Sequence, residues 1–439
     1  MRNRLRCPTI SIHRFRPAPS EVKRPRLRRS LWALLLLFTG IAVALSGCRG
    51  RSASNVVLWA HRVDLAALVE LYNAGDRPYK VEMRYIPDPA TAMEDASVPP
   101  DIIIADSIAN EEVAGYFSPL GNLLERGPIS NTVFYSDLLQ GGRIGGRQRL
   151  LPLSYDLPAV IFRLASENEG FPEFTLHVDE IRDHAAQFNE FNDERYVRLG
   201  LSPRWNHEFL YLLTMIHGAD FHETNRSAAW DEDGLRASVS YIRDWIGDSN
   251  SGVSYEDAFA ARYLYDPKYQ LLMRERIRFA YVRASQLFRY TDSQRQRIDY
   301  RWVRGDHGIP VLENVVYVGM PQNSPNRRGA QDFVEWLLQA ETQGKILESV
   351  RAKRIPDFGI AGGFSAIPEV NERHFPRYYP ALLGRIARED MLAFPHRVPR
   401  HWHALRTEVV EPWLNREASG LPQPRPLHEE IRLWLLQRG

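Results

Sequence analysis

The sequence predicts an α/β protein, and three neighbouring segments carry this prediction. Residues 56–60 (VVLWA) form an apolar run that indicates a buried strand. Residues 64–73 then place apolar side chains three and four positions apart, which is typical of a helix. Residues 81–86 (VEMRYI) and 101–105 (DIIIA) indicate two further strands. A strand, a helix and another strand in succession are typical of an α/β unit with a parallel sheet.

The first helix has a candidate start signal. Leu65, Leu68, Val69 and Tyr72 lie at helical spacing, and Asp64 precedes them. An aspartate at this position can accept a hydrogen bond from the backbone of the first turn. We therefore expect Asp64 to cap the helix.

Similar patterns predict elements along the rest of the chain. Strands are expected at 150–153, 158–162, 278–282 and 313–319. Helices are expected at 178–188, 208–217, 233–246, 263–276 and 328–348. Residues 110–125 mix helix and turn signals, and the glycines of residues 141–149 (GGRIGGRQR) predict a hairpin turn. The tail, 374–439, is expected to add helices interrupted by prolines.

The first 47 residues predict an export signal. A basic run at 23–29 precedes fifteen mostly apolar residues at 31–45, which are too few to cross a bilayer comfortably. Residues 1–47 contain ten Lys and Arg and one Glu, a charge of +9, so the chain's total of +2 leaves −7 for the remainder. An acidic body argues against a nucleic-acid partner, which needs a basic surface.

Leu45-Ser46-Gly47-Cys48 resembles the bacterial lipobox. This resemblance implies that 1–47 is a lipoprotein signal peptide, that cleavage precedes Cys48, and that the acylated cysteine anchors the protein to a membrane of the cell envelope. Residues 48–54 would then be a tether near the lipid. An uncleaved signal anchor is the alternative. With Cys7 removed, Cys48 is the one cysteine left, so a disulfide within the mature chain is excluded.

The order of the segments resembles the sugar-type extracellular solute-binding proteins of ABC importers, the family of maltose-binding protein. The clearest piece is 316–348, in which a strand is followed by a Ser-Pro-Asn turn and a helix with the pattern A-x-x-F-x-x-W-L. Five other pieces carry the resemblance: 56–72, 100–124 (PDIIIAD, then GYFSPLGNLL), 151–162 (LPLSYDLPAVIF), 218–221 (GADF) and 362–368 (GGFSAIP).

The resemblance implies a two-lobed, type II periplasmic-binding-protein-like fold with extra C-terminal helices. Each lobe would be a mostly parallel sheet flanked by helices. Lobe one would comprise 55–158 and 308–345, and lobe two 159–307 and 346–439. A protein of this family is a monomer that closes on a sugar-like ligand in the cleft and delivers it to ABC permease subunits. No catalytic residue, cofactor or metal is implied.

Candidate ligand contacts follow predicted strands or lie at the first crossing between lobes, because ligands of open α/β sheets bind beyond the carboxyl ends of strands. They are Trp59, His61, Asp106, Ser107, Tyr155, Asp156, Trp205, Asn206, Arg283, Ser285 and Phe364. A sugar needs flat aromatic surfaces and paired polar groups. An arginine in the cleft would suit a phosphate or carboxylate on the ligand. Structural roles compete with these roles, such as core packing for Trp59, a helix cap for Asp106 and an acid partner for Arg283.

Three other functions stay open. An enzyme is disfavoured because HExxH and Gly-x-Ser-x-Gly are absent, although a glycosidase carboxylate pair has no short motif to search for. A metal-binding protein is suggested only by Tyr378-Tyr379, which resembles the tyrosine pair of iron-binding relatives of the same fold. A binding lipoprotein that serves a sensor would use the same closing cleft, so the sequence does not separate it from a transport protein.

Overall fold

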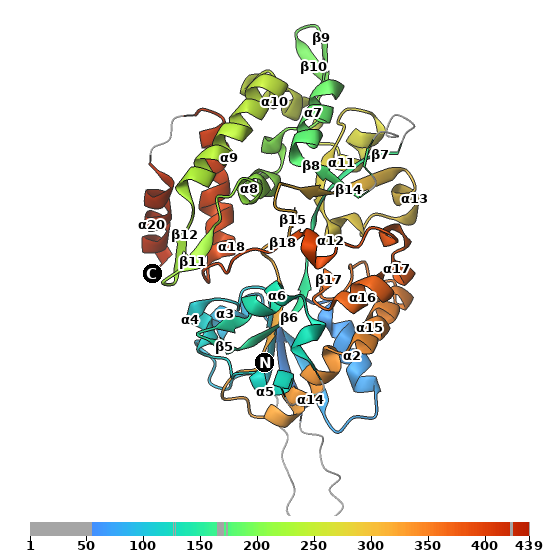
Figure 1. The fold of residues 1–439 in the computed structure, drawn as a ribbon, viewed down its shortest axis with the longest axis vertical. Coiled ribbons are helices and arrows are strands. Elements are labelled where there is room, and N and C mark those ends of the chain that lie inside the picture. Colours follow the sequence, from blue (N-terminus) through green and yellow to red (C-terminus); the bar gives the residue numbers. More distant parts are fainter. Residues whose placement is uncertain are drawn as a thin grey trace, which may run out of the picture. The chain divides into compact units, whose positions relative to one another are not determined.

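Figure 1 shows two lobes, each built around a sheet with helices on its faces. The structure, a computed structural model, describes residues 55–125, 127, 129–164, 171–172, 174–421 and 425–438. The predicted signal peptide, the tether and Cys48 lie outside these residues. We call the part around the six-stranded sheet lobe one and the part around the four-stranded sheet lobe two.

The sheet of lobe one has the order β17-β6-β16-β3-β1-β2. Its strands are β1 (Asn55–Ala60), β2 (Lys80–Tyr85), β3 (Ile102–Ala105), β6 (Leu150–Tyr155), β16 (Val316–Gly319) and β17 (Phe364–Ser365). Strand β1 pairs in parallel with β2 and β3, as the strand-helix-strand pattern predicts. Strand β16 pairs antiparallel with β3 and β6, and β17 pairs antiparallel with β6.

The expectation of a mostly parallel sheet is therefore wrong for lobe one, although the α/β class is confirmed. Strands β1, β2, β3 and β6 share one direction, and β6 leads the chain out toward lobe two. Strands β16 and β17 come after the chain has visited lobe two. They re-enter the sheet from the side at which β6 leaves it, so they run in the opposite direction.

The sheet of lobe two is also mixed. It has the order β13-β7-β14-β8, with β7 at Pro158–Arg163, β8 at Thr175–His177, β13 at Ala280–Arg283 and β14 at Ile298–Arg304. Strand β7 pairs antiparallel with β13 and β14, and β14 pairs in parallel with β8. The sequence did not predict β14, because its arginines hide the apolar pattern. Arg301 is 5% exposed and donates to Asp299 at 2.6 Å.

Most predicted helices form, and two differ for local reasons. Helices α2 (Leu65–Ala74), α7 (Val178–Phe188), α8 (His207–Ile216) and α9 (Glu232–Asp244) match their patterns closely. The prediction of one helix at 263–276 is wrong. Helix α10 (Val253–Tyr263) ends at the residue where the predicted helix would begin, and Pro267 separates α10 from the short α11 (Lys268–Met273). The helix expected at 328–348 is two helices, α14 (Arg327–Leu337) and α15 (Ala340–Ala352).

The chain leaves lobe one later than the family resemblance implied. Helix α15 packs against α2, and β17 lies in the six-stranded sheet, so 346–365 belongs to lobe one and not to lobe two. The tail then reaches lobe two, where β18 (Leu392–Ala393) pairs with β15 (Ile309–Pro310). Its last helices include α18 (Trp402–Leu405), α19 (Glu411–Ala418) and α20 (Leu427–Arg438). Helix α19 packs on α8 and α9.

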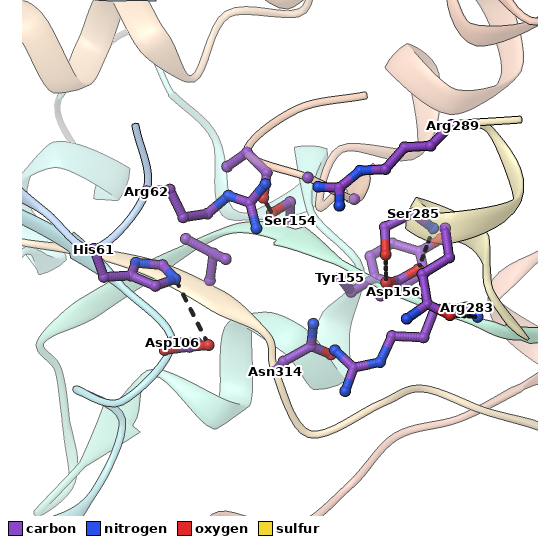
Figure 2. A pocket seen from close by; sticks show the side chains of 15 residues that line it. His61, Arg62, Asp106, Ser154, Tyr155, Asp156, Arg283, Ser285, Arg289 and Asn314 are labelled. Carbon is purple, nitrogen blue, oxygen red and sulfur yellow. Dashed lines mark hydrogen bonds and ion pairs between the residues drawn. The ribbon is translucent and has the colours of Figure 1, made fainter. Parts of the chain in front are cut away.

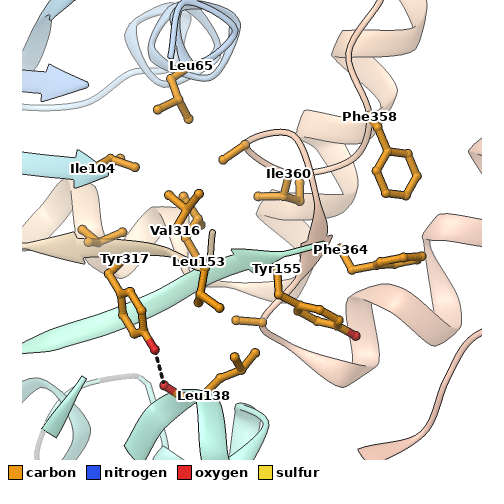
Figure 3. Close-up of a cluster of buried hydrophobic side chains, with 14 of the residues drawn as sticks. Leu65, Ile104, Leu138, Leu153, Tyr155, Val316, Tyr317, Phe358, Ile360 and Phe364 are labelled. Carbon is orange, nitrogen blue, oxygen red and sulfur yellow. Dashed lines mark hydrogen bonds between the residues drawn. The ribbon is translucent and has the colours of Figure 1, made fainter. Parts of the chain in front are cut away.

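Aromatic packing joins the two lobes on one side. Phe364 of β17 contacts Trp302 of β14 with ring centroids 5.8 Å apart, and Phe288 stacks on Phe358 at 4.6 Å. Figure 3 shows Phe358, Phe364 and Tyr155 in this cluster. A second apolar cluster fills lobe two around α8 and includes Trp402, Trp413 and Trp434 of the tail. The tail therefore extends the core of lobe two.

None of the helices described by the structure is both long and apolar enough to cross a membrane.

Candidate ligand-binding site

A polar cavity of about 200 Å³ lies where the ends of strands from the two lobes meet (Figure 2). Lobe one contributes His61 after β1 and Asp106 after β3. Lobe two contributes Arg283 at the end of β13 and Ser285 in the short helix α12 (Ala284–Leu287). Between them lies Asp156, on the crossing that joins β6 to β7. The site therefore has walls on both lobes and a floor on the connection between them.

Asp156 is the buried anchor of this floor. It is 1% exposed, and its carboxylate accepts hydrogen bonds from the Leu157 N–H at 2.9 Å, the Ser285 N–H at 3.1 Å and the Ser285 hydroxyl at 2.5 Å. Burial raises the pKa of Asp156 to about 6, against the opposing effect of these hydrogen bonds and of the Arg283 charge. The contacts hold the start of α12 against the crossing.

Arg283 projects from the end of β13 and is fixed by an acid of lobe two. Its Nε donates to the Glu208 carboxylate, which also accepts a hydrogen bond from the Tyr281 hydroxyl at 2.9 Å. Burial lowers the pKa of Arg283, but the charge and hydrogen bond of Glu208, together with the nearby Tyr281 and Asp156, more than offset this effect, and the net shift is upward. The guanidinium therefore stays charged at the cavity wall.

His61 and Asp106 form the lobe-one wall. The His61 Nδ1 lies 3.2 Å from the Ile104 carbonyl oxygen, and its Nε2 lies 3.6 Å from the Asp106 Oδ2. Strands β1 and β3 are neighbours in the sheet, so their carboxyl ends bring these two side chains together.

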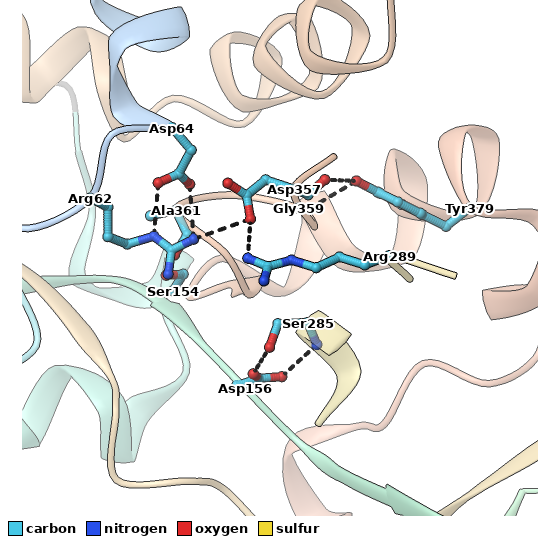
Figure 4. A network of polar contacts seen from close by, with 10 residues as sticks. All are labelled: Arg62, Asp64, Ser154, Asp156, Ser285, Arg289, Asp357, Gly359, Ala361 and Tyr379. Atoms are coloured by element: carbon cyan, nitrogen blue, oxygen red, sulfur yellow. Dashed lines mark hydrogen bonds and ion pairs between the residues drawn. The ribbon is translucent and has the colours of Figure 1, made fainter. Parts of the chain in front are cut away.

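Two arginines from different lobes meet at one carboxylate (Figure 4). Arg62, which follows β1, donates to Asp64 through Nε at 2.9 Å and through Nη2 at 3.2 Å. The same Nη2 lies 3.4 Å from the Asp357 Oδ1, and Arg289 of lobe two donates to that oxygen at 2.6 Å. The sequence suggested that the Asp64 side chain caps α2, but it accepts no hydrogen bond from the first turn of that helix. Arg62 engages its carboxylate instead. Burial raises the pKa of Asp64, which Arg62 opposes.

Gly362 makes room for Arg62. Its φ of +78° is a left-handed conformation that favours glycine, and a Cβ there would lie 2.3 Å from Arg62 Nη2. The predicted turn at 362–368 thus has a direct geometric role at the cavity.

Six of the eleven residues predicted as ligand contacts line this cavity: His61, Asp106, Tyr155, Asp156, Arg283 and Ser285. Five do not: Trp59, Ser107, Trp205, Asn206 and Phe364.

Those five have other structural roles or positions. Trp59 is 9% exposed in the core of lobe one, and Phe364 is 2% exposed in the aromatic cluster. Trp205 stacks on Phe259 with centroids 5.3 Å apart. Asn206 caps α8 by accepting from the Phe209 N–H at 3.1 Å. Ser107 follows β3 but is not on the cavity wall; its carbonyl accepts from Asn110 at 2.9 Å.

Tyr155 reaches the cavity wall, but its ring belongs to the core. It is 2% exposed and contacts Tyr135 and Phe364 with centroid distances of 5.5 and 5.7 Å. Burial raises the pKa of its hydroxyl well above the usual value. An aromatic residue at the crossing was a reasonable sign of a sugar platform, yet its face is covered here.

Sequence reasoning missed several residues on the cavity wall: Arg62, Ser154, Gln286, Arg289, Asn314, Val316 and 361–363. Arg62 is the second residue after a predicted strand, so the expectation that ligands bind beyond the carboxyl ends of strands could have found it. Asn314, which was expected within the strand at 313–319, lies in the loop before β16, and Arg289 lies in the turn after α12. No local pattern marks either side chain as part of a cavity.

Among the residues that the structure describes, no group of three or more His, Cys, Asp or Glu side chains could hold a metal ion. Tyr378 and Tyr379 lie outside the cavity wall. The Tyr379 hydroxyl accepts a hydrogen bond from the Gly359 N–H at 2.9 Å, and its ring packs on Phe358 at 4.9 Å.

Comparison with solved structures identifies the architecture. The sugar-binding protein MalE from Xanthomonas citri has a TM-score of 0.62 with this chain at 13% identity, over 88% of this chain and 100% of that one. The ABC substrate-binding protein Lmo0181 from Listeria monocytogenes, in complex with cycloalternan, has a TM-score of 0.60 at 12% identity, over 88% and 99%. The chain has the type II periplasmic-binding-protein fold.

The type II fold also occurs in an enzyme among the neighbours. Thiaminase I from Bacillus thiaminolyticus has a TM-score of 0.54 at 12% identity, over 83% of this chain and 99% of that one. No family model matches the sequence, and no curated protein matches it. The likeness therefore establishes the fold, and the function has to be argued from the cavity.

Proposed function

We propose that this protein captures a small sugar or sugar derivative between its two lobes and delivers it to the permease of an ABC importer. The observation that carries the proposal is the polar cavity with walls from both lobes, reached by strand ends and by the crossing at Asp156. In a two-lobed protein, a ligand that bonds to both walls stabilises the closed arrangement by its difference in affinity for the two states. The sugar-binding neighbours of the same fold agree with this use of the cavity.

The carboxylates on the wall support binding more than catalysis. The Asp156 oxygens already accept three hydrogen bonds from Ser285 and Leu157, and Asp106 pairs with His61. A general acid or base needs a carboxyl group within hydrogen-bond reach of the reacting atom. Asp156 is instead engaged in holding the lobes' connection, so we propose a binding protein without catalytic residues or a cofactor.

A ligand screen tests the capture of a sugar. The full chain, purified in detergent, would be examined by thermal shift against monosaccharides, oligosaccharides and sugar acids. A ligand at a hundredfold excess over its Kd stabilises the folded state by about 2.7 kcal/mol, which raises the Tm. Stabilisation by amino acids, peptides or metal ions alone, with none by any sugar, would contradict the proposal.

Delivery to a permease is a separate part of the proposal, since a sensor-linked binding protein would use the same cavity. Uptake of the labelled ligand by cells should fall when the gene is deleted and return with the intact gene. Loss of a transcriptional response with normal uptake would instead favour the sensor.

We further propose that an acyl-modified Cys48 anchors the protein to a bilayer on the extracytoplasmic side of the envelope. Its support is the lipobox-like Leu45-Ser46-Gly47-Cys48 after an apolar stretch. Cells fed radiolabelled palmitate should label the chain, and Cys48→Ser should abolish the label. Label on Cys48→Ser equal to that on the parent protein would refute acylation at this thiol.

A further inference from the structure

Three guanidinium groups converge on the cavity, two of them from lobe two. Arg283 and Arg289 lie on either side of α12, and Arg62 follows β1 in lobe one. Figure 2 shows the ends of all three side chains directed toward the space between His61 and Ser285.

Acids hold these arginines from outside the cavity wall. Asp64, Asp357 and Glu208 bind the guanidinium groups, and none of the three acids lines the cavity. In the part of the chain that the structure describes, Arg62 Nη1, both Nη atoms of Arg283, and Arg289 Nε and Nη1 make no hydrogen bond to protein. Each guanidinium is therefore fixed in position and keeps donors for a ligand.

The wall offers few acceptors to match these donors. The Asp156 carboxylate is engaged by Ser285 and Leu157, which leaves the Asp106 carboxylate, 3.6 Å from the His61 Nε2, as the one carboxylate on the described wall that can accept from a ligand. Asn314 Oδ1 is buried and has no partner among the described residues, so it can receive a single ligand hydroxyl. A ligand that satisfies this wall has to bring acceptor atoms, and a carboxylate or phosphate supplies them in the planar, paired geometry that arginine prefers.

The cavity also lacks the surface that a neutral oligosaccharide needs. Tyr155 is the single Phe, Tyr or Trp on the described wall, and its ring is covered by Tyr135 and Phe364. The volume of about 200 Å³ is below the roughly 300–1,000 Å³ of pockets for drug-sized ligands. Both features favour one small ring or chain over several stacked sugar units.

We propose that the ligand is a polyhydroxy compound of monosaccharide size that carries a carboxylate or phosphate, with the anion held between Arg62 and Arg289 and a hydroxyl on Asn314. This inference rests on the proposed function and names its substrate class. Asp357 holds Arg62 of lobe one beside Arg289 of lobe two. An anion bound by both arginines would therefore bridge the two lobes and stabilise their closed arrangement.

Matched ligands test the inference. Isothermal titration calorimetry on the full chain in detergent would compare glucose, galactose and mannose with their uronic acids and 6-phosphates. We expect the best acidic ligand to bind at least tenfold more tightly than its neutral parent. Its Kd should rise with NaCl concentration, because salt screens charge interactions, while the Kd of a neutral sugar should not.

A variant separates the anion site from general sugar binding. Arg289→Gln, at a side chain that is 50% exposed, should weaken the acidic ligand at least tenfold more than it weakens the neutral parent. Arg236→Gln on α9 is the matched control, because that arginine is 75% exposed and pairs only with Asp233 among the described residues. It should change neither Kd.

The outcomes distinguish the inference from the function on which it rests. Neutral sugars that bind as tightly as their acids, or an Arg289→Gln variant that binds the acids normally, would overturn the inference and leave sugar capture intact. Absence of binding by every sugar, neutral and acidic, would overturn both.

Discussion

The Ser285 hydroxyl donates a hydrogen bond to the Asp156 carboxylate at 2.5 Å and so fastens lobe two to the crossing between the lobes. Asp156 is 1% exposed, and its pKa of about 6 lies well above the ordinary aspartate value. The contact therefore couples the connection between the lobes to pH.

The first prediction concerns this pH dependence. Because the folded-state pKa is raised, the folded protein binds more protons than the unfolded chain between about pH 4 and 6, so Asp156 makes the protein less stable as pH rises through this range. The loss is about 3 kcal/mol at most and is complete above the folded pKa. The Asp156→Asn variant has no carboxyl group at this position and should not show this loss. Urea unfolding from pH 4 to 8 should therefore show the parent protein losing stability relative to the variant as the pH rises.

Ser285→Ala provides the companion variant. The Ser285 hydroxyl lowers the pKa of Asp156, so its removal should extend the decline to higher pH. A stability difference between the parent and Asp156→Asn that is constant with pH would show that this carboxyl group titrates normally.

The second prediction concerns Tyr155. Since its ring is packed between Tyr135 and Phe364, Tyr155→Ala should lower the free energy of unfolding by about 3–5 kcal/mol. Tyr155→Phe keeps the ring and should lower it by less than about 1.5 kcal/mol. Urea denaturation measures both. Normal stability of Tyr155→Ala with weakened ligand binding would instead make Tyr155 an exposed ligand contact.

The third prediction uses two glycines with similar backbones. Gly362 has φ +78°, and a Cβ there would lie 2.3 Å from Arg62 Nη2, whereas Gly384 has φ +73° and no neighbouring atom within 4 Å of the point that a Cβ would occupy. Both Gly→Ala variants should lose about 1–2 kcal/mol from backbone strain. Only Gly362→Ala should also displace Arg62 and weaken ligand binding, by about tenfold or 1.4 kcal/mol. Calorimetry and urea unfolding separate the two effects, and equal binding by both variants would contradict the role of Gly362.

The fourth prediction concerns a contact between the tail and lobe one. The Arg400 side chain is 6% exposed and donates to Glu94, to Glu112 at 2.7 Å and to the Thr91 hydroxyl at 2.9 Å. Glu94 is 41% and Glu112 is 37% exposed, so solvent screens both pairs, and each contributes about 1 kcal/mol at most. Arg400→Ala should therefore favour separation of the lobes and increase the radius of gyration measured by small-angle X-ray scattering.

Arg236→Ala is the control for this variant, because its exposed pair with Asp233 lies within α9. Its scattering curve should match that of the parent protein. An Arg400→Ala curve identical to both would show that the tail does not restrain the lobes.

Local sequence determined most of the elements. The apolar runs of β1 and β3 and the helical spacing of α7 needed no tertiary context, because side-chain periodicity follows from backbone geometry. The expectation that ligands bind beyond the carboxyl ends of strands also led to His61, Asp106 and Arg283, which line the cavity. Local pattern failed at β14, where the buried Arg301 is neutralised by Asp299 of the same strand, and Asp299 also accepts a hydrogen bond from Arg385 of the distant tail.

Tertiary structure alone decided which polar and aromatic side chains meet. Tyr155 and Phe364 had the chemistry of sugar contacts, yet pairing of β17 with β6 buried both rings. Arg62 and Arg289 are far apart in the sequence and meet at Asp357 because each lobe delivers one of them. Periodicity reports the environment within one element, whereas a cavity between lobes depends on contacts between distant elements, which no local pattern encodes.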